Sequence, residues 1–175
     1  MLAKQLGADI DGAWWPYSGS LATELPNLVA ALQQQLGEII EICLNWSETD
    51  GQLDFDAMVA GSRWSTAMRP KRLRLVRVTG RSAEITLLVV PPRTSVALGA
   101  LVMRCAAVLP IANADRNSPL FATADSVVDA ALAESARWGR PVHCVGAEAD
   151  VRTGLGQPDG AVRVPAVQPA GTEAR

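Results

Sequence analysis

The sequence has few of the residues from which catalytic and metal sites are usually built. Its 175 residues include one histidine and three cysteines, and aromatic residues make up 5% of the chain. The cysteines form no CxxC pair, so we expect neither a metal ion nor another cofactor. The chain also has no GxSxG, P-loop or GxGxxG motif, which leaves no recognisable nucleophile or nucleotide-binding loop.

A long uninterrupted apolar run is missing too. The nearest candidate for a membrane span, residues 94–114, is interrupted by Arg104 and Pro110. A spanning helix needs about 20 predominantly apolar residues, so this segment predicts a helix of a soluble core, and we expect no membrane partner. Residues 1–12 carry two aspartates where a signal peptide would be apolar. Three cysteines are a sparse, odd set, which favours a cytoplasmic protein with buried or idle thiols.

The chain has no excess of either charge. Its 16 basic and 18 acidic residues give a formal net charge of -2 at pH 7, which argues against a dedicated nucleic-acid or anionic-membrane binder. Lysine is scarce: 14 of the basic residues are arginine and two are lysine, whereas alanine occupies 28 positions. Arginine and alanine have GC-rich codons, so this bias indicates a GC-rich bacterial source.

Apolar residues are abundant, at 49% of the chain, and they suffice for one sizeable core. We expect a single domain over residues 1–148. Residues 151–175 contain seven glycines or prolines and no aromatic residue. This composition predicts a disordered tail over residues 149–175, and the alternative is a segment that folds on a partner.

Hydrophobic periodicity predicts where the helices and strands lie. A leucine stripe at spacings of three and four residues predicts a helix that begins near Glu24 and ends at Gly37; its members are Leu21, Leu25, Leu28, Leu32 and Leu36. Runs rich in β-branched residues predict strands over residues 39–46, 72–79 and 84–90, with a weaker strand over residues 58–64. The last two of the stronger strands should form a hairpin, because four residues containing a glycine separate them.

Two more helices are expected in the second half of the chain. One begins at Thr94 or Ser95 and reaches residue 108, and the other begins near Ser126 and ends at Gly139. The strands follow one another rather than alternating with helices. The sequence therefore predicts an α+β fold, with a small antiparallel sheet of three to five strands and three helices packed on it.

The hexad at residues 11–16 (DGAWWP) is the most distinctive local feature. Together with residues 21–26 (LATELP) and 87–92 (LLVVPP), it resembles an uncharacterised actinobacterial family of unknown function. The resemblance covers residues 6–108 approximately. It implies family membership, and it implies no activity, cofactor or catalytic residue.

Two tryptophans in this hexad are the first candidates for ligand binding. Trp14 and Trp15 should point to opposite faces of an extended backbone, so that one enters the core and the other stays partly exposed. Fixed beside Pro16, they could line a pocket for an aromatic or cationic ligand. The alternative is a pair of core anchors. Asp11 is expected to cap the turn rather than to catalyse.

Basic residues gather in one segment that contains no acid. Six of the 16 lie within residues 69–81, and no Asp or Glu occurs between Asp56 and Glu84. A bulge near residues 75–76 would bring Arg72, Arg74 and Arg77 to one face, where Trp64 could add a stacking surface for a phosphorylated or single-stranded nucleic-acid ligand. The alternative is a solvated strand face whose arginines pair with carboxylates such as Glu41.

No complete catalytic set emerges from the remaining polar residues. His143 and Cys144 are adjacent, so on a strand they face opposite ways and cannot act as a base and its nucleophile. A zinc site from the histidine and the three cysteines would need all of them to converge without a paired spacing. The acids at residues 50, 54 and 56 do not follow the EF-hand pattern and are expected in a solvated loop.

The expected function is a non-enzymatic cytosolic domain that binds an unknown small molecule or protein. Its candidate ligand-binding residues are Trp14, Trp15, Trp64, Arg72, Arg74 and Arg77. Two alternatives stay open: a small enzyme that brings Asp11, Cys43 or His143 together in a closed pocket, and a nucleotide or single-stranded nucleic-acid binder. A third is a regulatory subunit that docks through residues 151–175. The sequence predicts neither the ligand nor the oligomeric state.

Overall fold

The α+β fold expected from the sequence is confirmed. A computed structural model describes residues 1–47, 50–59, 72–138 and 143–146. Within these ranges the chain forms, in order, β1 (Gly12–Trp14), α1 (Leu21–Leu36), β2 (Ile39–Leu44), α2 (Phe55–Val59), β3 (Leu75–Gly80), β4 (Glu84–Val89), α3 (Val96–Ala106), α4 (Asn113–Arg116), α5 (Pro119–Arg137) and β5 (His143–Gly146). Trp64 and the expected tail over residues 149–175 lie outside the described residues.

The strands form one sheet in the order β1-β4-β3-β2-β5. The three pairs among β2, β3, β4 and β5 are antiparallel, as expected, but β1 runs parallel to β4. The prediction missed β1 because Asp11-Gly12 was interpreted as a turn, although the backbone at Trp14 was expected to be extended. It can run parallel because the chain between β1 and β4 passes through α1, β2 and β3, so no tight hairpin constrains its direction.

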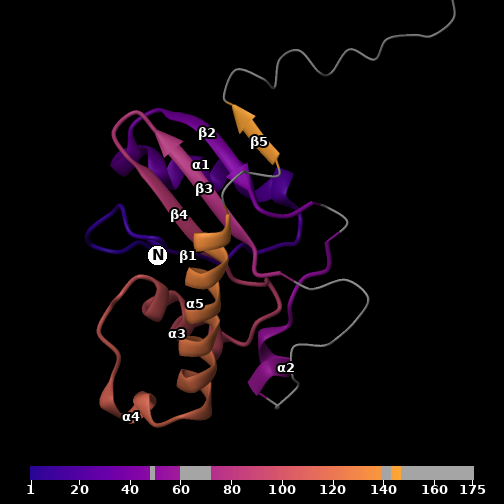
Figure 1. Cartoon of the computed structure of the whole chain (residues 1–175), viewed down its shortest axis with the longest axis vertical. Helices are drawn as coiled ribbons and strands as arrows, with labels where there is room; N and C mark the ends of the chain where they lie inside the picture. Colours follow the sequence, from indigo (N-terminus) through magenta and orange to yellow (C-terminus); the bar gives the residue numbers. More distant parts are fainter. Residues whose placement is uncertain (48–49, 60–71, 139–142, 147–175) are drawn as a thin grey trace, which may run out of the picture.

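Helices cover both faces of this sheet, and the two cores are separate (Figure 1). On the α1 face, leucines of α1 pack against β2, β3 and β4. On the opposite face, which we call the α3/α5 face, α3 and α5 pack with α2 against the other side of the same strands. Along β3 the alternation is direct: Val76 and Val78 face α1, whereas Leu75 belongs to the α3/α5 core.

The leucine stripe does form the buried side of α1, with Leu28, Leu32 and Leu36 in the core. Gly37 ends the helix at a φ of 72°, and its N–H donates to the Gln33 carbonyl. The predicted start near Glu24 is wrong. The helix begins at Leu21, which leaves Pro26 inside it and brings Glu24 into the first turn.

The hairpin of β3 and β4 is confirmed, and its ladder runs without a break from the Leu75–Leu88 pair to the Thr79–Glu84 pair. No bulge occurs in it, so the predicted alignment of the arginines on one face is wrong. β4 lies in the interior of the sheet, and its residues from Ile85 onwards are buried on both faces, as its unbroken apolar run indicated.

Two other boundaries differ from the predictions. The start of the weak strand expected over residues 58–64 belongs to the short helix α2, and residues 60–64 lie outside the described residues. The last helix, α5, begins at Pro119 rather than near Ser126, because Ser118 is its N-cap and accepts a hydrogen bond from the Phe121 N–H. Among the described helices, none is long and apolar enough to cross a membrane.

Candidate functional site

Two cavities adjoin each other on the α1 face. The smaller one, about 740 Å³, lies under the first turn of α1, where the carboxyl ends of β1, β2 and β4 meet the start of β3. We call it the Trp46 cavity. The larger one, about 850 Å³, runs along the N-terminal residues and the middle of α1. Both volumes fall within the range typical of small-molecule sites.

The Trp46 cavity has two aromatic walls. Trp14 ends β1, and Trp46 follows β2 in phase with the buried residues Ile42 and Leu44. Both tryptophans line this cavity, together with the apolar side chains of Leu21, Leu44 and Val89. A cavity with such walls favours a ligand that has a flat or apolar body.

Arg74 reaches the same cavity from the residue before β3. Its guanidinium carbon lies 5.3 Å from the centre of the Trp46 ring, and its Nη2 donates to the Asp50 carbonyl at 2.8 Å. Its Nε is buried and has no hydrogen-bond partner. Burial lowers the pKa of Arg74, and the nearby charge of Asp50 opposes this shift. The guanidinium stays charged at neutral pH, and it retains capacity to donate to an anionic group.

Glu24 supplies the opposite charge. It lies in the first turn of α1, its residue is only 6% exposed, and it lines both cavities. Its carboxylate has no hydrogen-bond or ion-pair partner among the described residues, and it forms no ion pair with Arg74. The carboxylate oxygens stay accessible to solvent within the cavity, so a cationic or hydrogen-bonding group there could pair with them directly.

The structure brings three of the predicted ligand-binding residues to the two cavities. Trp14 and Trp15 both line the larger cavity, as expected for a pocket beside Pro16. Trp14 and Arg74 line the Trp46 cavity. Trp15 turns to the α3/α5 face, as the alternation predicts, where its ring packs against α3 and its Nε1 donates to the Pro91 carbonyl at 3.1 Å. A Cβ on Gly99 of α3 would lie 2.6 Å from this ring, so only glycine allows the close approach.

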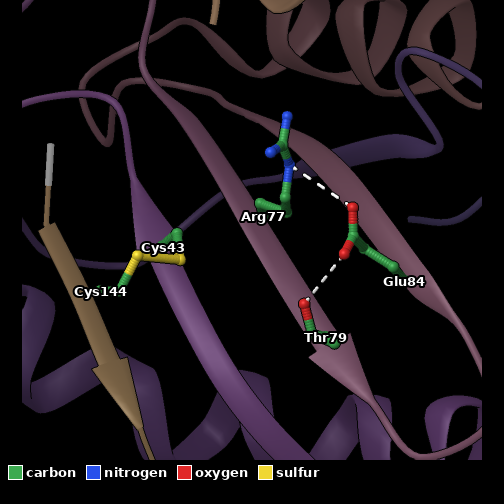
Figure 2. The surroundings of a disulfide bond; sticks show 5 residues. All are labelled: Cys43, Arg77, Thr79, Glu84 and Cys144. Carbon is green, nitrogen blue, oxygen red and sulfur yellow. Dashed lines mark hydrogen bonds and ion pairs between the residues drawn. A yellow bond between two sulfur atoms is a disulfide. The ribbon is translucent and has the colours of Figure 1, made fainter. Parts of the chain in front are cut away.

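The other two arginines lie away from the cavity. Arg72 is exposed, and its Nη1 lies 3.9 Å from a carboxylate oxygen of Glu134 on α5. Arg77 extends over the Trp138 ring on the α3/α5 face, with 4.6 Å from its guanidinium carbon to the ring centre. Its Nε lies 3.6 Å from Glu84, which also accepts a hydrogen bond from Thr79 (Figure 2).

Glu24 and Trp46 were not among the predicted ligand-binding residues. A signal existed for each of them. Glu24 lies three residues after Leu21 and four before Leu28, so it falls on the apolar stripe of α1. Trp46 continues the alternation of β2, which placed it on the α1 face.

Asp11 is structural, in agreement with the expected cap. Its side chain is 1% exposed and accepts hydrogen bonds from the N–H groups of Gly7 and Ala8 at 2.6 and 3.0 Å. Its second oxygen accepts the Thr86 N–H at 2.9 Å, which ties the N-terminal turn to β4. β4 and β3 separate it from Cys43 in β2, so these two candidates for an enzyme site do not meet.

The expectation of idle thiols is wrong for two of the three cysteines. Cys43 and Cys144 are register partners in β2 and β5, with Cα atoms 4.1 Å apart, and they form a disulfide (Figure 2). Glu41 lies within 4.8 Å of their sulfur atoms, but sulfurs joined in a disulfide do not supply the thiolates that a metal ion prefers. Cys105 is free, and burial together with the charge of Asp125 raises its pKa.

Comparison with known proteins identifies a family. Residues 1–106 match the model of a family of unknown function (DUF5994). This match confirms, at the family level, the resemblance seen over residues 6–108 approximately. No curated protein and no solved structure matches the chain significantly.

Proposed function

The chain belongs to the DUF5994 family of unknown function, and because this membership assigns no activity, we propose from the geometry that it is a domain that binds a small organic molecule in the Trp46 cavity. One observation carries the proposal. Two tryptophans, a charged arginine and a carboxylate that forms no ion pair with this arginine line one cavity of about 740 Å³. Polar groups that converge without satisfying one another are typical of a binding site rather than of a packed core.

The cavity is better equipped for binding than for catalysis. Acid–base or nucleophilic catalysis needs a base within hydrogen-bond distance of the group it activates. Among the described residues that line the Trp46 cavity, Glu24 is the one carboxylate, and no cysteine or histidine lies beside it. Asp11 is saturated by three N–H donors, and Cys43 lies in the core of the α3/α5 face rather than beside this cavity. These contacts favour a binding domain over the alternative of a small enzyme.

A nucleic-acid ligand fits this geometry less well. A single strand needs a continuous basic groove with stacking surfaces along it. Arg74 and Arg77 lie on opposite faces of the sheet, and Arg72 lies beside α5. A small molecule needs only the charges within one cavity, and Arg74 provides one there.

We further propose an actinobacterial source and a cytoplasmic location. The excess of arginine and alanine and the sparse cysteines support them. In a reducing cytoplasm Cys43 and Cys144 would be thiols in resting cells, and the disulfide would form during oxidation. Alkylation of the protein in intact cells, followed by mass spectrometry, tests this: a fully oxidised pair in unstressed cells contradicts the proposal.

Tryptophan fluorescence tests the proposed binding function. Trp14 and Trp46 line the cavity, so a ligand should change their emission and raise the melting temperature of the protein. A library of amino acids, nucleotides, organic acids and amines supplies the candidates. The changes should disappear in Arg74→Gln and persist in the control Arg77→Gln. The proposal is wrong if no compound produces either change, or if the changes are the same in both variants.

A further inference from the structure

We propose that the Trp46 cavity binds a zwitterion with an aromatic body, that is, an aromatic α-amino acid or a close relative of one. The inference rests on the proposed binding function and adds the chemical class of the ligand. It follows from three features of the cavity: the lone carboxylate, the incompletely paired guanidinium and the aromatic walls.

Glu24 calls for a cationic group on the ligand. Its residue is 94% removed from solvent, given the exposed fraction of 6%, and no described side chain neutralises its carboxylate. It lines the Trp46 cavity directly. A primary ammonium has three N–H donors and could donate to both carboxylate oxygens. The attraction between the two opposite charges is stronger in a partly desolvated cavity than in bulk water.

Arg74 calls for an anionic group. The Asp50 carbonyl accepts a hydrogen bond from Nη2, and the guanidinium carbon lies 5.3 Å from the centre of the Trp46 ring. The Nε is buried, so a ligand in the cavity can contact only the Nη atoms. A carboxylate can accept from two guanidinium nitrogens at once. Such a contact, made to the Nη atoms, would leave Arg74 in place over Trp46.

The arrangement of the two charges excludes simpler ligands. Glu24 and Arg74 line one cavity but form no ion pair, so a ligand bound between them can contact both side chains. A pure cation would leave Arg74 unsatisfied, and a simple acid would leave Glu24 unsatisfied. A phosphate ester would bring about two negative charges at neutral pH, and among the described lining residues Arg74 is the single cation to meet them.

The body of the ligand follows from the walls. Trp14 and Trp46 present large apolar surfaces, and Leu44 and Val89 form the floor along the sheet. Aromatic rings prefer offset-stacked or edge-to-face contacts with tryptophan. A ring attached to the carbon that carries the ammonium and the carboxylate could therefore occupy this space while both charged groups reach their partners.

Three probes of matched shape separate the contributions in the unaltered protein. L-phenylalanine carries both charges, phenethylamine lacks the carboxylate, and 3-phenylpropanoate lacks the ammonium. In isothermal titration calorimetry we expect L-phenylalanine to bind about tenfold or more tightly than either analogue, because each analogue leaves one buried charged group unpaired. Equal affinities for the three probes would overturn the inference.

Two variants assign each charge to its partner. Glu24→Gln should abolish the preference for L-phenylalanine over 3-phenylpropanoate and keep the preference over phenethylamine. Arg74→Met should abolish the preference for L-phenylalanine over phenethylamine and keep the preference over 3-phenylpropanoate. Glu38→Gln and Arg77→Met are matched controls. Glu38 is exposed and paired with Arg81, and Arg77 lies on the other face of the sheet. Each control variant should keep the preference for L-phenylalanine over the two analogues. Circular dichroism verifies that each variant is folded.

Failure of this inference differs from failure of the proposed function. If another class of compound gives the Arg74-dependent fluorescence change and L-phenylalanine and its analogues do not bind, the zwitterion is wrong and the binding function stands. If L-phenylalanine binds but Glu24→Gln leaves both preferences intact, the assigned geometry is wrong. If neither the library nor the three probes bind, both proposals fall.

Discussion

The sheet carries the same pair of residue types on each of its two faces, with different surroundings. On the α1 face Arg74 lies over Trp46 beside a cavity, and its Nη2 donates to the Asp50 carbonyl. On the α3/α5 face Arg77 stacks on Trp138 and forms an ion pair with Glu84. The two arginines therefore differ in their surroundings: Arg74 lines the Trp46 cavity, whereas Arg77 forms an ion pair with a carboxylate on the other face.

The helices cover the two faces differently. On the α3/α5 face, Ala124 and Ala131 of α5 are fully buried and small enough for close helix packing, and Gly99 of α3 leaves room for the Trp15 ring. On the α1 face a single helix covers the strands, and its buried leucines lie in its middle and last turns. The first turn of α1, with Leu21 and Glu24, extends over the end of the sheet and forms the roof of the Trp46 cavity.

Truncation of one leucine in each covering helix tests this difference most strongly. Leu98 of α3 is fully buried, so Leu98→Ala should lower the free energy of unfolding by about 2–5 kcal/mol. Leu28 of α1 is 6% exposed and already borders a cavity, and we expect about 1–3 kcal/mol for Leu28→Ala. Urea denaturation measures both values. Equal losses would contradict the contrast between the two faces.

The disulfide should give the next largest effect. It joins residues separated by 101 positions and ties β5, a strand at the edge of the sheet, to β2. In the chain-entropy model a closed loop of this size is stabilising, and we expect Cys144→Ser to cost roughly 2–4 kcal/mol. Cys105→Ser is the control and should change stability little.

Cys43 belongs to the core of the α3/α5 face, so removal of this bond should leave ligand binding in the Trp46 cavity unaltered. Ligand titration of Cys144→Ser verifies that separation. An unfolding midpoint that does not respond to the reduction of the wild-type protein would contradict the stabilising role.

Gly99 tests how tightly the α3/α5 face is packed. A Cβ at this position would lie 2.6 Å from the Trp15 ring, so Gly99→Ala should force the ring or the helix to move and cost about 1–3 kcal/mol. Gly19 is the matched control, because a Cβ there meets no atom within 4 Å. Thermal melting of both variants measures the difference. A Gly99→Ala protein as stable as Gly19→Ala would show that this packing is loose.

The two arginines should differ in what they support. Arg77→Met removes the ion pair with Glu84 and the stacking on Trp138, and we expect a loss of about 0.5–2 kcal/mol in stability with unchanged ligand affinity. Arg74→Met should have the smaller effect on stability and abolish binding. Urea denaturation and calorimetry on the same samples measure both. If Arg77→Met abolishes binding and Arg74→Met does not, the recognition role has been assigned to the wrong face of the sheet.

The last prediction concerns the reactivity of the Cys105 thiol rather than the stability of the fold. The raised pKa of this thiol means that its thiolate fraction at pH 7 is smaller than that of an ordinary cysteine. In the unreduced protein, iodoacetamide should modify this one cysteine slowly at pH 7, and the rate should still be rising above pH 9. Mass spectrometry follows the reaction. A rate that levels off below pH 8 would contradict the predicted direction.

The sequence predicted what depends on neighbours along the chain. The leucine stripe identified α1, the spacing of two apolar runs identified the β3–β4 hairpin, and alternation placed Trp14 and Trp15 on opposite sides. The errors arose where local signals compete. Ser118 and Pro119 began α5 earlier than the Ser126 signal indicated, and the turn signal at residues 11–12 concealed β1.

Half of the candidate site could be predicted in the same way. Trp14 and Arg74 were recognised as candidates from residue type and local pattern. Their proximity to each other, and to Glu24 and Trp46, depends on the order of the strands, because the four residues come from β1, α1, the end of β2 and the start of β3. No periodicity along the chain encodes that order.

The sequence by itself determined the class of fold, the approximate positions of the main strands and helices, and the near balance of positive and negative charge. Only the tertiary structure decided that Cys43 meets Cys144, that Arg74 and Arg77 serve different faces, and that Glu24 faces a cavity without a partner. The physical reason is the distance along the chain over which each interaction acts. Backbone propensity and hydrophobic period act over a few residues, whereas a disulfide, a buried charge and a cavity depend on residues far apart in the chain that packing brings together.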